Sequence, residues 1–430
     1  MFPKHRKSIC KLTQILRGLE ENVENYEMLL ALQRALVDRL RRTEKRIATL
    51  KQQCVTLNQQ KRGRLTKDAA TLVKRHINAV KEQIQFEQHL LFIWRCFGDG
   101  IAFIYLDKYA LKHMLYNTHD YTVKQSAGAL SDKDGFRLEW SILQAVARKQ
   151  SVPAVLCDLT NTIRHGDVCV LVGPDPIPIE VKSSKNTNLR VERQLASLQA
   201  LLDFLATDKA ENFRGVPNVR RGEGPVLEEV HASVMNECIA RSRATGFAAI
   251  SPEEGLTYIC IRDAKRVEQL NQFAGSRLIY TSLNDAKTEG AWMPYYPFTL
   301  SIRDPEALYE FISGEITLIV LLDANIFVRR FAEHGLHVEF LDHDGYALMV
   351  SHLGSTSEGE SRSALSKQMF GRLFHEFGSI GQLVDVEVAH LNQLEAQFAE
   401  LAAKVANGEL PADTNNVSTP VFKRLEWADP

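Results

Sequence analysis

Two acidic side chains and a lysine lie within sixteen positions of one another, in a pattern suited to metal-assisted chemistry. Asp167 precedes one apolar stretch, and Glu180 and Lys182 lie at the end of another. Residues 173–176 between the two stretches are Gly-Pro-Asp-Pro, which is typical of a turn. The segment therefore predicts a β-hairpin whose polar residues lie near the open end of both strands.

The register of this hairpin predicts which side chains share a face. If Val172 opposes Ile177, the numbers of opposed residues sum to 349, and within each strand residues of one parity lie on one face. Asp167 is then directly across from Lys182 and diagonal to Glu180, on the polar face. The other face is entirely apolar, and we expect it to be buried; it consists of Val168, Val170, Val172, Ile177, Ile179 and Val181.

This polar face has the chemistry of phosphodiester hydrolysis. Two carboxylates at cross-strand or diagonal separation can bind one hard divalent cation. We therefore expect Mg²⁺ as the cofactor, with Mn²⁺ as a substitute, bound by Asp167 and Glu180. Lys182 would orient the attacking water or stabilise the developing negative charge. The alternative is a surface ion-pair cluster on a half-exposed hairpin.

The segment resembles the PD-(D/E)xK, or restriction-endonuclease-like, nuclease superfamily, whose core is a helix, three strands, a helix and a further strand. Asp167 matches the acidic residue that begins the second strand, although Gly166 stands where the family has proline. Glu180-Val181-Lys182 matches the (D/E)-x-K motif of the third strand. The likeness covers about residues 135–265, under a third of the chain.

The resemblance implies further site residues. Glu139 matches a glutamate that many members have on the first helix, and Gln194 matches a glutamine on the following helix; for both, a solvated helix residue is the alternative. Leu198 replaces the tyrosine that accompanies this glutamine in one branch of the family. The metal ligands would be Asp167, Glu180 and the carbonyl of Val181, and the residues in contact with the substrate backbone would be Ser183, Ser184 and Lys185, which otherwise simply end the strand.

Residues 1–97 are expected to form a long, basic helical arm. They contain 20 Lys and Arg against 9 Asp and Glu, and apolar residues follow heptad spacing in two series separated by Lys61-Arg62-Gly63-Arg64. This pattern predicts an antiparallel helical hairpin, or long helices that pair between chains. Through these helices the chain is expected to form a homodimer or higher oligomer. The charge suits contact with nucleic acid; the alternative is a solvated helical surface.

The predicted fold class is α+β or α/β, with a helical coiled-coil hairpin followed by a restriction-endonuclease-like αβββαβ core and a C-terminal mixed α/β region. The expected regions are the arm 1–97, a junction 98–134, a nuclease-like domain 135–303 and a mixed α/β and helical region 304–430. The expected elements include helices at Phe136–Lys149 and Arg190–Ala206, strands at Ala154–Leu159, Val168–Val172, Ile177–Lys182 and Phe298–Ile302, and an exposed loop at Phe213–Pro225.

Composition excludes other classes. No apolar run of the 430 residues approaches the roughly 20 that a membrane helix needs. The seven cysteines include no CxxC pair, which favours a cytoplasmic protein with reduced thiols. The chain has no GxxxxGK[ST], GxGxxG, HExxH or GxSxG motif, so ATP-driven and serine-hydrolase chemistry has no support.

The expected function is thus a Mg²⁺-dependent nuclease, an endonuclease rather than an exonuclease, that acts on DNA. A restriction or antiviral defence role is implied by analogy alone. One alternative is a non-catalytic coiled-coil adaptor whose nuclease-like domain binds nucleic acid or protein. A nuclease directed at RNA is the other.

Overall fold

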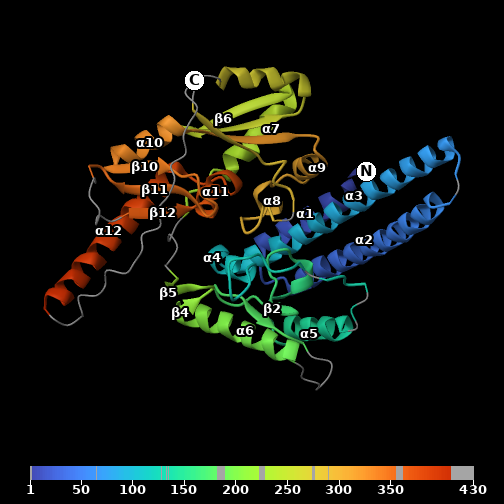
Figure 1. Ribbon diagram of the computed structural model, residues 1–430, viewed down its shortest axis with the longest axis horizontal. Coiled ribbons are helices and arrows are strands. Elements are labelled where there is room, and N and C mark those ends of the chain that lie inside the picture. The colour runs from blue at the N-terminus through green and yellow to red at the C-terminus, as the bar shows by residue number, and fades with distance from the viewer. Residues whose placement is uncertain are drawn as a thin grey trace. The chain divides into compact units, whose positions relative to one another are not determined.

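The chain forms two compact units in a computed structural model (Figure 1). The first unit comprises residues 1–224 and 286–313, and the second comprises 225–285 and 314–430. The structure describes residues 2–63, 65–126, 128–131, 133, 135–181, 189–221, 228–273, 277–288, 290–354 and 362–407. This division differs from the four expected regions, because residues 1–97, the junction 98–134 and the first half of the nuclease-like region share one unit.

The first unit is mostly helical and contains two small sheets. In chain order its elements are η1 (Phe2–His5), α1 (Arg6–Glu21), α2 (Tyr26–Lys61), α3 (Lys67–Tyr105), α4 (Lys108–Leu111), η2 (Lys112–Met114), α5 (Phe136–Lys149), β1 (Ala154–Leu156), η3 (Cys157–Leu159), β2 (Val168–Val170), β3 (Ile177–Ile179), α6 (Leu189–Thr207), β4 (Lys209–Phe213), β5 (Val216–Arg220), α8 (Phe298–Ser301) and α9 (Pro305–Ser313). Strands β1, β2 and β3 form an antiparallel sheet in that order, and β4 pairs with β5 in a separate hairpin.

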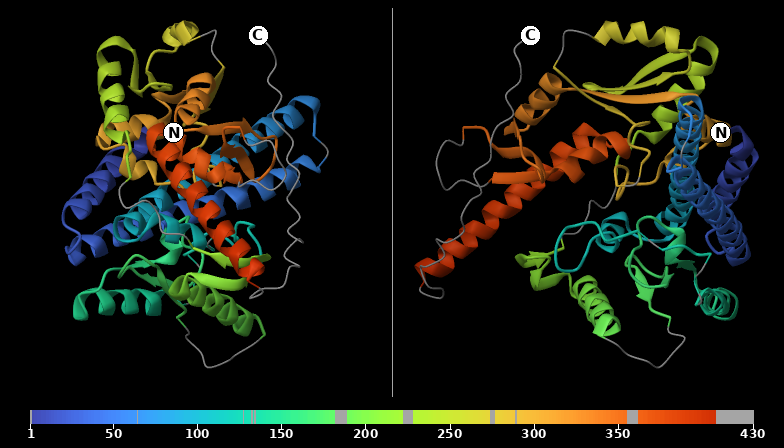
Figure 2. Two further views of the ribbon diagram at one scale, coloured as in Figure 1. Left: turned by 90° about the vertical axis from the view of Figure 1, so that its left-hand side faces the viewer. Right: turned by 45° about the vertical axis from the view of Figure 1, so that its right-hand side comes forward.

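Helices α2 and α3 lie side by side as a long hairpin (Figures 1 and 2). The side chain of Asn25 caps α2 by accepting the Met28 N–H, and the side chain of Thr66 caps α3 by accepting the Ala69 N–H. The seam between the helices is buried and includes Leu36, Leu40, Ile47, Leu50, Ile77 and Val80. The apolar seams therefore cover each other within one chain, which is the hairpin alternative.

Two polar residues that interrupt the α2 seam have partners elsewhere in the first unit. The Gln33 amide donates to the Ala154 carbonyl at 2.9 Å and accepts the Leu156 N–H at 3.0 Å. It thereby provides hydrogen-bond partners for backbone groups of β1, which is the edge strand of its sheet. Thr43 accepts the Trp94 indole N–H at 3.3 Å. The Gln33 contacts fix the sheet against the helical hairpin, and the Thr43 contact joins the two helices of the hairpin to each other.

Helix α5 was predicted with the bounds that the structure has. Its buried side chains recur at helical spacing and form one stripe: Phe136, Glu139, Trp140, Leu143 and Ala147. The stripe faces α2, where the Arg34 guanidinium lies 4.8 Å from the Trp140 ring and that of Arg41 lies 3.9 Å from the Phe136 ring. Glu139 is thus on the covered side of its helix.

The second unit has a four-stranded and a three-stranded antiparallel sheet with helices. Its elements are α7 (Ala232–Thr245), β6 (Phe247–Glu253), β7 (Leu256–Ile261), η4 (Ala264–Phe273), β8 (Leu278–Ser282), β9 (Thr317–Asp323), α10 (Ala324–Glu333), β10 (Leu336–Phe340), β11 (Tyr346–His352), β12 (Arg362–Ser366), α11 (Lys367–His375) and α12 (Ile380–Ala406). The strand orders are β6-β7-β9-β8 and β10-β11-β12. The protein is therefore a mixed α+β chain with long N-terminal helices and small antiparallel sheets.

Two sequence-based elements were wrong. The strand expected at Phe298–Ile302 is helix α8, whose four residues are all buried, so the apolar alternation there does not reflect a two-faced strand. The loop expected at Phe213–Pro225 contains the turn of the β4–β5 hairpin and the whole of β5. Arg214 and Gly215 at its turn both have positive φ, 56° and 77°, which suits a tight hairpin turn. No helix among the described residues is long and apolar enough to cross a membrane.

Candidate functional site

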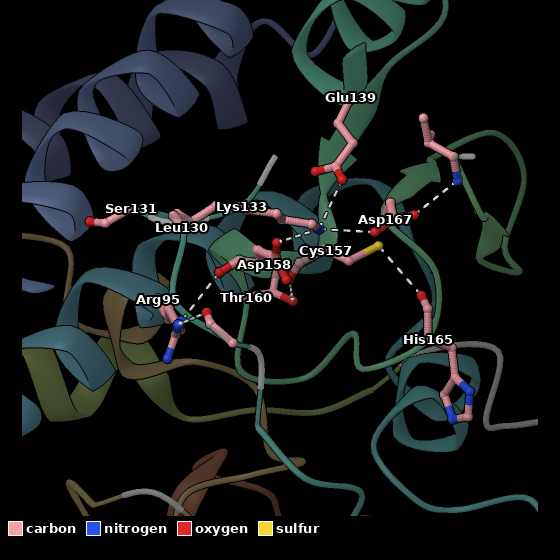
Figure 3. A network of polar contacts seen from close by, with 12 residues as sticks. Arg95, Leu130, Ser131, Lys133, Glu139, Cys157, Asp158, Thr160, His165 and Asp167 are labelled. Atoms are coloured by element: carbon pink, nitrogen blue, oxygen red, sulfur yellow. Dashed lines mark hydrogen bonds and ion pairs between the residues drawn. The ribbon is translucent and has the colours of Figure 1, made fainter. Parts of the chain in front are cut away.

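Three carboxylates of the first unit converge on one lysine (Figure 3). The Lys133 ammonium lies 2.9 Å from Glu139 Oε1, 2.8 Å from Asp158 Oδ2 and 2.9 Å from Asp167 Oδ1. Glu139 comes from the first turn of α5, Asp158 from η3 directly after β1, and Asp167 from the residue before β2. We call these four residues the carboxylate cluster.

The loop that carries Lys133 is fixed by a buried carboxylate of α2. Glu44 accepts the N–H groups of Leu130 and Ser131 at 2.9 and 2.8 Å, and the Ser131 hydroxyl at 2.7 Å. From α3, Arg95 donates to the carbonyl of Asp158 at 3.2 Å. The helical hairpin therefore positions two members of the carboxylate cluster, which gives the N-terminal helices a role in building this site.

Asp167 is also oriented by the neighbouring strand. Its Oδ2 accepts the Val181 N–H at 2.9 Å, and its own N–H donates to the Ile179 carbonyl at 2.9 Å. Gly166 before it has φ of +80°, and a Cβ at that position would lie 2.9 Å from Pro178 Cβ. This close approach accounts for glycine where the resembled family has proline, because any side chain would force β3 away.

The charge of the carboxylate cluster is unbalanced. Three carboxylates share one ammonium, and the side chains are largely enclosed, with 27% of Lys133 and 3% of Glu139 exposed. Burial raises the pKa of the Glu139 carboxyl, and the Lys133 ammonium only partly opposes this. Burial disfavours the charged form of Lys133, but its hydrogen bonds with Asp158, Asp167 and Glu139 outweigh that and raise its pKa above the usual lysine range.

A pocket of about 690 Å³ is lined in part by Gly166, the residue before Asp167. Lys124, His165, Glu180 and Arg193 are among its lining residues. Lys124 Nζ donates to His165 Nδ1 at 3.2 Å, and His165 Nε2 donates to the Tyr116 carbonyl at 2.9 Å. Burial, with Lys124 nearby, lowers the pKa of His165 to about 4, so its ring is neutral at pH 7 and can accept from Lys124.

The electrostatics of the pocket favour an anion. Burial lowers the pKa of Lys124, although the Glu180 carboxylate opposes this shift. His119 and Arg193 add further basic groups to the lining. A phosphate group that entered the pocket would supply the negative charge that the partly buried Lys124 ammonium favours.

The register of the β2–β3 hairpin differs from the expected one. Val168 pairs with Ile179 and Val170 with Ile177, so opposed numbers sum to 347 and the turn spans residues 171–176. Tertiary contacts hold this wider turn: the Pro174 carbonyl accepts the Asp107 N–H, and the Asp175 carboxylate pairs with Arg221. The expected pairing of Val172 with Ile177 was therefore wrong, although a shift of two residues leaves the two sets of side chains unchanged. The expected pairing of Asp167 with Lys182 involves a residue outside the described part of the chain.

The buried face of this hairpin was also wrong at several positions. Val172, Ile177 and Ile179 are 49%, 43% and 37% exposed, although all three belong to the face expected to be buried. Cys169 and Leu171 of the opposite face are 0% and 2% exposed. Alternation separates two faces but does not say which one the rest of the chain covers, and cysteine and leucine are apolar enough to be the covered set.

The predicted site residues fall into three groups. Asp167 and Glu139 meet at Lys133, with the Val181 backbone bound to Asp167 by its N–H. Glu180 lines the pocket. The others cannot be placed: Gln194 belongs to α6 but its side chain lies outside the described part of the chain, as do Lys182, Ser183, Ser184 and Lys185.

Two members of the carboxylate cluster were missed from the sequence. Asp158 lies in the stretch that was expected to be a strand, Ala154–Leu159, and a carboxylate at the end of a strand beside Asp167 was the signal that could have found it. Lys133 lies in an irregular segment before α5 and carries no comparable signal. Among the described residues no group of three or more His, Cys, Asp and Glu is arranged to hold a metal ion; where Glu139, Asp158 and Asp167 converge, the ammonium of Lys133 takes the centre.

Comparison with known proteins adds no relative. The chain matches no protein-family model. It matches no curated protein. It matches no solved structure either.

Proposed function

We propose that this protein is a divalent-metal-dependent nuclease of the PD-(D/E)xK type that hydrolyses phosphodiester bonds of DNA. The observation that carries the proposal is the convergence of Glu139, Asp158 and Asp167, from three separate elements, on a single cation. Two of these three residues were assigned from the motif alone. A site that gathers hard oxygen donors around a positive charge has the donor chemistry of a Mg²⁺ centre.

The order of elements supports the same proposal. Elements α5, β1, β2, β3, α6 and β4 follow one another as helix, three strands, helix and strand, which is the order of the resembled core. The acidic residues lie at the first helix and at the start of the second strand, as that resemblance implies. The likeness stops at the last strand, since β4 pairs with β5 instead of extending the sheet of β1, β2 and β3.

A divalent ion would offset more of the negative charge of the carboxylate cluster than the Lys133 ammonium does. Lys133 offsets one of the three negative charges around it, whereas Mg²⁺ or Mn²⁺ would offset two. Glu139, Asp158 and Asp167 would hold the ion once Lys133 has withdrawn, together with Glu180 and the Val181 carbonyl assigned from the motif. When bound, the ion supplies a water of lowered pKa and stabilises negative charge on the phosphate.

The protein's own residues would bind and orient the substrate. Lys124, held by the neutral ring of His165, would bind a phosphate oxygen in the pocket next to Asp167. The Val181 N–H keeps Asp167 turned toward the cluster. Lys182 would orient the attacking water, as the motif implies. Binding, positioning and charge stabilisation are thus divided between the pocket and the carboxylate cluster.

A cleavage assay tests this function. Purified protein is incubated with circular plasmid and with linear DNA, in Mg²⁺ or Mn²⁺. We expect cleavage of both forms, and a loss of at least about 100-fold in Asp167→Asn, because one ligand of the ion is removed. Glu211→Gln, a change of an exposed carboxylate on β4, is the matched control and should cleave normally. Undiminished cleavage by Asp167→Asn would remove the assignment.

Comparing the substrates in the same assay decides between endonuclease and exonuclease cleavage and between DNA and RNA. A circular plasmid is cut only by an endonuclease, so cleavage of linear DNA alone would assign exonuclease activity. RNA of the same sequence, tested in parallel, separates a DNA enzyme from an RNA enzyme. Lys124→Gln should weaken cleavage by raising KM, because Lys124 is proposed to bind phosphate and not the metal.

One observation favours the adaptor as a second candidate. Lys133 occupies the point where an ion would bind, so the carboxylate cluster can serve as a structural ion-pair network without metal. Calorimetric titration with Mn²⁺ separates the two functions. A nuclease binds Mn²⁺ more tightly than its Asp167→Asn variant does, whereas an adaptor binds it equally weakly in both.

A further inference from the structure

The outer part of the α2–α3 hairpin is strongly basic. We call residues 45–63 and 65–82 the basic arm. Its exposed cations are Lys45, Arg46, Lys51, Lys61, Arg62, Lys67, Lys74, Arg75 and Lys81, and its exposed carboxylates are Asp68 and Glu82. Charge of one sign therefore covers both helices along their outer turns.

Most of this charge has no carboxylate partner among the described residues of the first unit. Arg46 pairs with Glu87 at 2.6 Å. Across the described ranges, none of the other eight cations of the basic arm forms an ion pair with a carboxylate. Eight positive charges at close spacing repel one another and favour a partner of opposite charge.

The basic arm is a preformed surface. Its inner seam is closed by apolar side chains such as Ile47, Leu50, Ile77 and Val80, which are 5–8% exposed. Farther out, Val55 and Leu72 are 49% and 54% exposed, so no third layer covers this end of the hairpin within the described residues. Figures 1 and 2 show the outer ends of α2 and α3 extending beyond α5 and the small sheet of the first unit.

The composition of the basic arm indicates the kind of polyanion. Residues 45–85 contain no Phe, Tyr or Trp, and His76 is their single ring, so the surface offers little on which a run of unpaired bases could stack. Between the cations lie exposed amides that can donate to phosphate and sugar oxygens: Gln52, Gln53, Gln59 and Gln60. Cations and amides without aromatic platforms fit the backbone of a duplex better than a single strand.

The length of the basic arm agrees with a nucleic-acid duplex as the partner. Residues 45–61 of α2 span about 24 Å at 1.5 Å per residue, which is the length of about seven base pairs of duplex. We propose that the basic arm binds the phosphate backbone of double-stranded nucleic acid, without reading its sequence. This surface lies outside the carboxylate cluster and the pocket, so the inference holds whether or not the protein cleaves its partner.

A salt-dependent binding experiment tests the proposal. A fluorescent 30-base-pair DNA duplex is titrated with full-length protein in the absence of divalent ions, at several KCl concentrations. The arm variant combines Lys51→Gln, Lys61→Gln, Arg62→Gln and Lys74→Gln. We expect at least a tenfold loss of affinity at low salt and a slope of log affinity against log salt that is smaller by about 3–4, because each lost phosphate contact removes close to one unit.

Matched controls make the result specific. Lys11→Gln, Lys149→Gln, Lys265→Gln and Lys367→Gln together remove the same charge from exposed positions outside the basic arm and should leave the slope unchanged. The Asp167→Asn protein should bind as the wild type does, which separates this surface from the proposed active site. Circular dichroism of the arm variant checks that its helices persist.

Several outcomes would overturn the proposal. A wild-type slope in the arm variant would show that these cations do not contact phosphate. Equal competition by poly-glutamate would assign the surface to acidic proteins instead. Salt-sensitive dimers that the arm variant loses would assign it to a second copy of this chain. Binding of single strands as tight as duplex would also contradict it, whereas a preference for duplex RNA over duplex DNA would keep the surface and name RNA as its partner.

Discussion

Asp99 and Asp167 are two carboxylates of the first unit that differ in what binds them. Asp99, on α3, is 4% exposed and accepts three N–H groups at 2.8 Å: the backbone groups of Asn161 and Thr162 and the side-chain amide of Asn161. Asp167 accepts one backbone N–H, and its second oxygen binds Lys133, which two other carboxylates share.

Asp99 is held in a structural role by its donors, whereas the cation that binds Asp167 can be replaced by another cation. The donors to Asp99 belong to the main chain or to a buried side chain, and they cannot leave without unfolding the loop that follows η3. The donor at the carboxylate cluster is the end of a flexible lysine side chain that is 27% exposed. A cation with that freedom can be replaced by another cation, whereas a ring of amides cannot.

The largest effect is expected at Asp99. Asp99→Ala leaves the N–H groups of Asn161 and Thr162 buried without acceptors, and each such group costs about 1–3 kcal/mol. We expect the free energy of unfolding to fall by about 4 kcal/mol, measured by urea denaturation. Asp38→Ala, at an exposed position of α2, should change it by less than about 0.5 kcal/mol. A loss of similar size in both variants would contradict the structural role of Asp99.

A smaller but more informative effect is expected at Lys133. Lys133→Met leaves three carboxylates without their cation, and we expect a loss of about 2–3 kcal/mol at pH 7. Because Met cannot compete for the centre, millimolar Mg²⁺ or Mn²⁺ should restore the thermal midpoint of this variant while shifting the wild type less.

Lys149→Met, an exposed change on α5, is the control and should respond to both ions as the wild type does. If Mn²⁺ leaves the midpoint of Lys133→Met unchanged, the carboxylate cluster is a structural ion-pair network. That result would favour the adaptor over the nuclease. Asp99→Ala provides a second contrast, since no added ion should restore its stability.

Much of the local structure was predictable because it depends on local patterns. Apolar residues at helical spacing predicted α5 with the bounds that it has, but not which side is covered: Leu138 is 40% exposed, whereas Glu139 is buried. The alternation around Gly173 to Pro176 predicted the β2–β3 hairpin and the parity that puts Asp167 at its polar end. The heptad pattern predicted the α2–α3 hairpin, with pairing between chains as its alternative.

The rest depends on contacts between distant residues. Asp167 meets Lys133 across 34 positions, and Gln33 of α2 meets β1 across more than 120. The register of β3 depends on Asp107 and Arg221, which no local pattern connects to the turn. Residues 286–313 join the first unit because α9 packs against α1, with Arg17 of α1 donating to backbone carbonyls near α8. Such pairs carry no signature in a single sequence.

The smallest effect is a change in pH dependence at Glu139. Burial raises the pKa of this carboxyl from its ordinary value of 4.5, so between the two values the folded protein holds a proton that the unfolded chain has released. The contribution of Glu139 to the free energy of unfolding of the wild type therefore decreases as pH rises from about 4.5.

The variant Glu139→Gln keeps an oxygen that can accept from Lys133 but does not titrate. Its free energy of unfolding should therefore increase relative to that of the wild type as pH rises from 4 to 7. Urea denaturation across that range measures the difference, with Glu211→Gln as the exposed control. If the wild type instead gained on the variant with rising pH, the Lys133 ammonium would outweigh burial, and the negative charge on Glu139 would stabilise the fold.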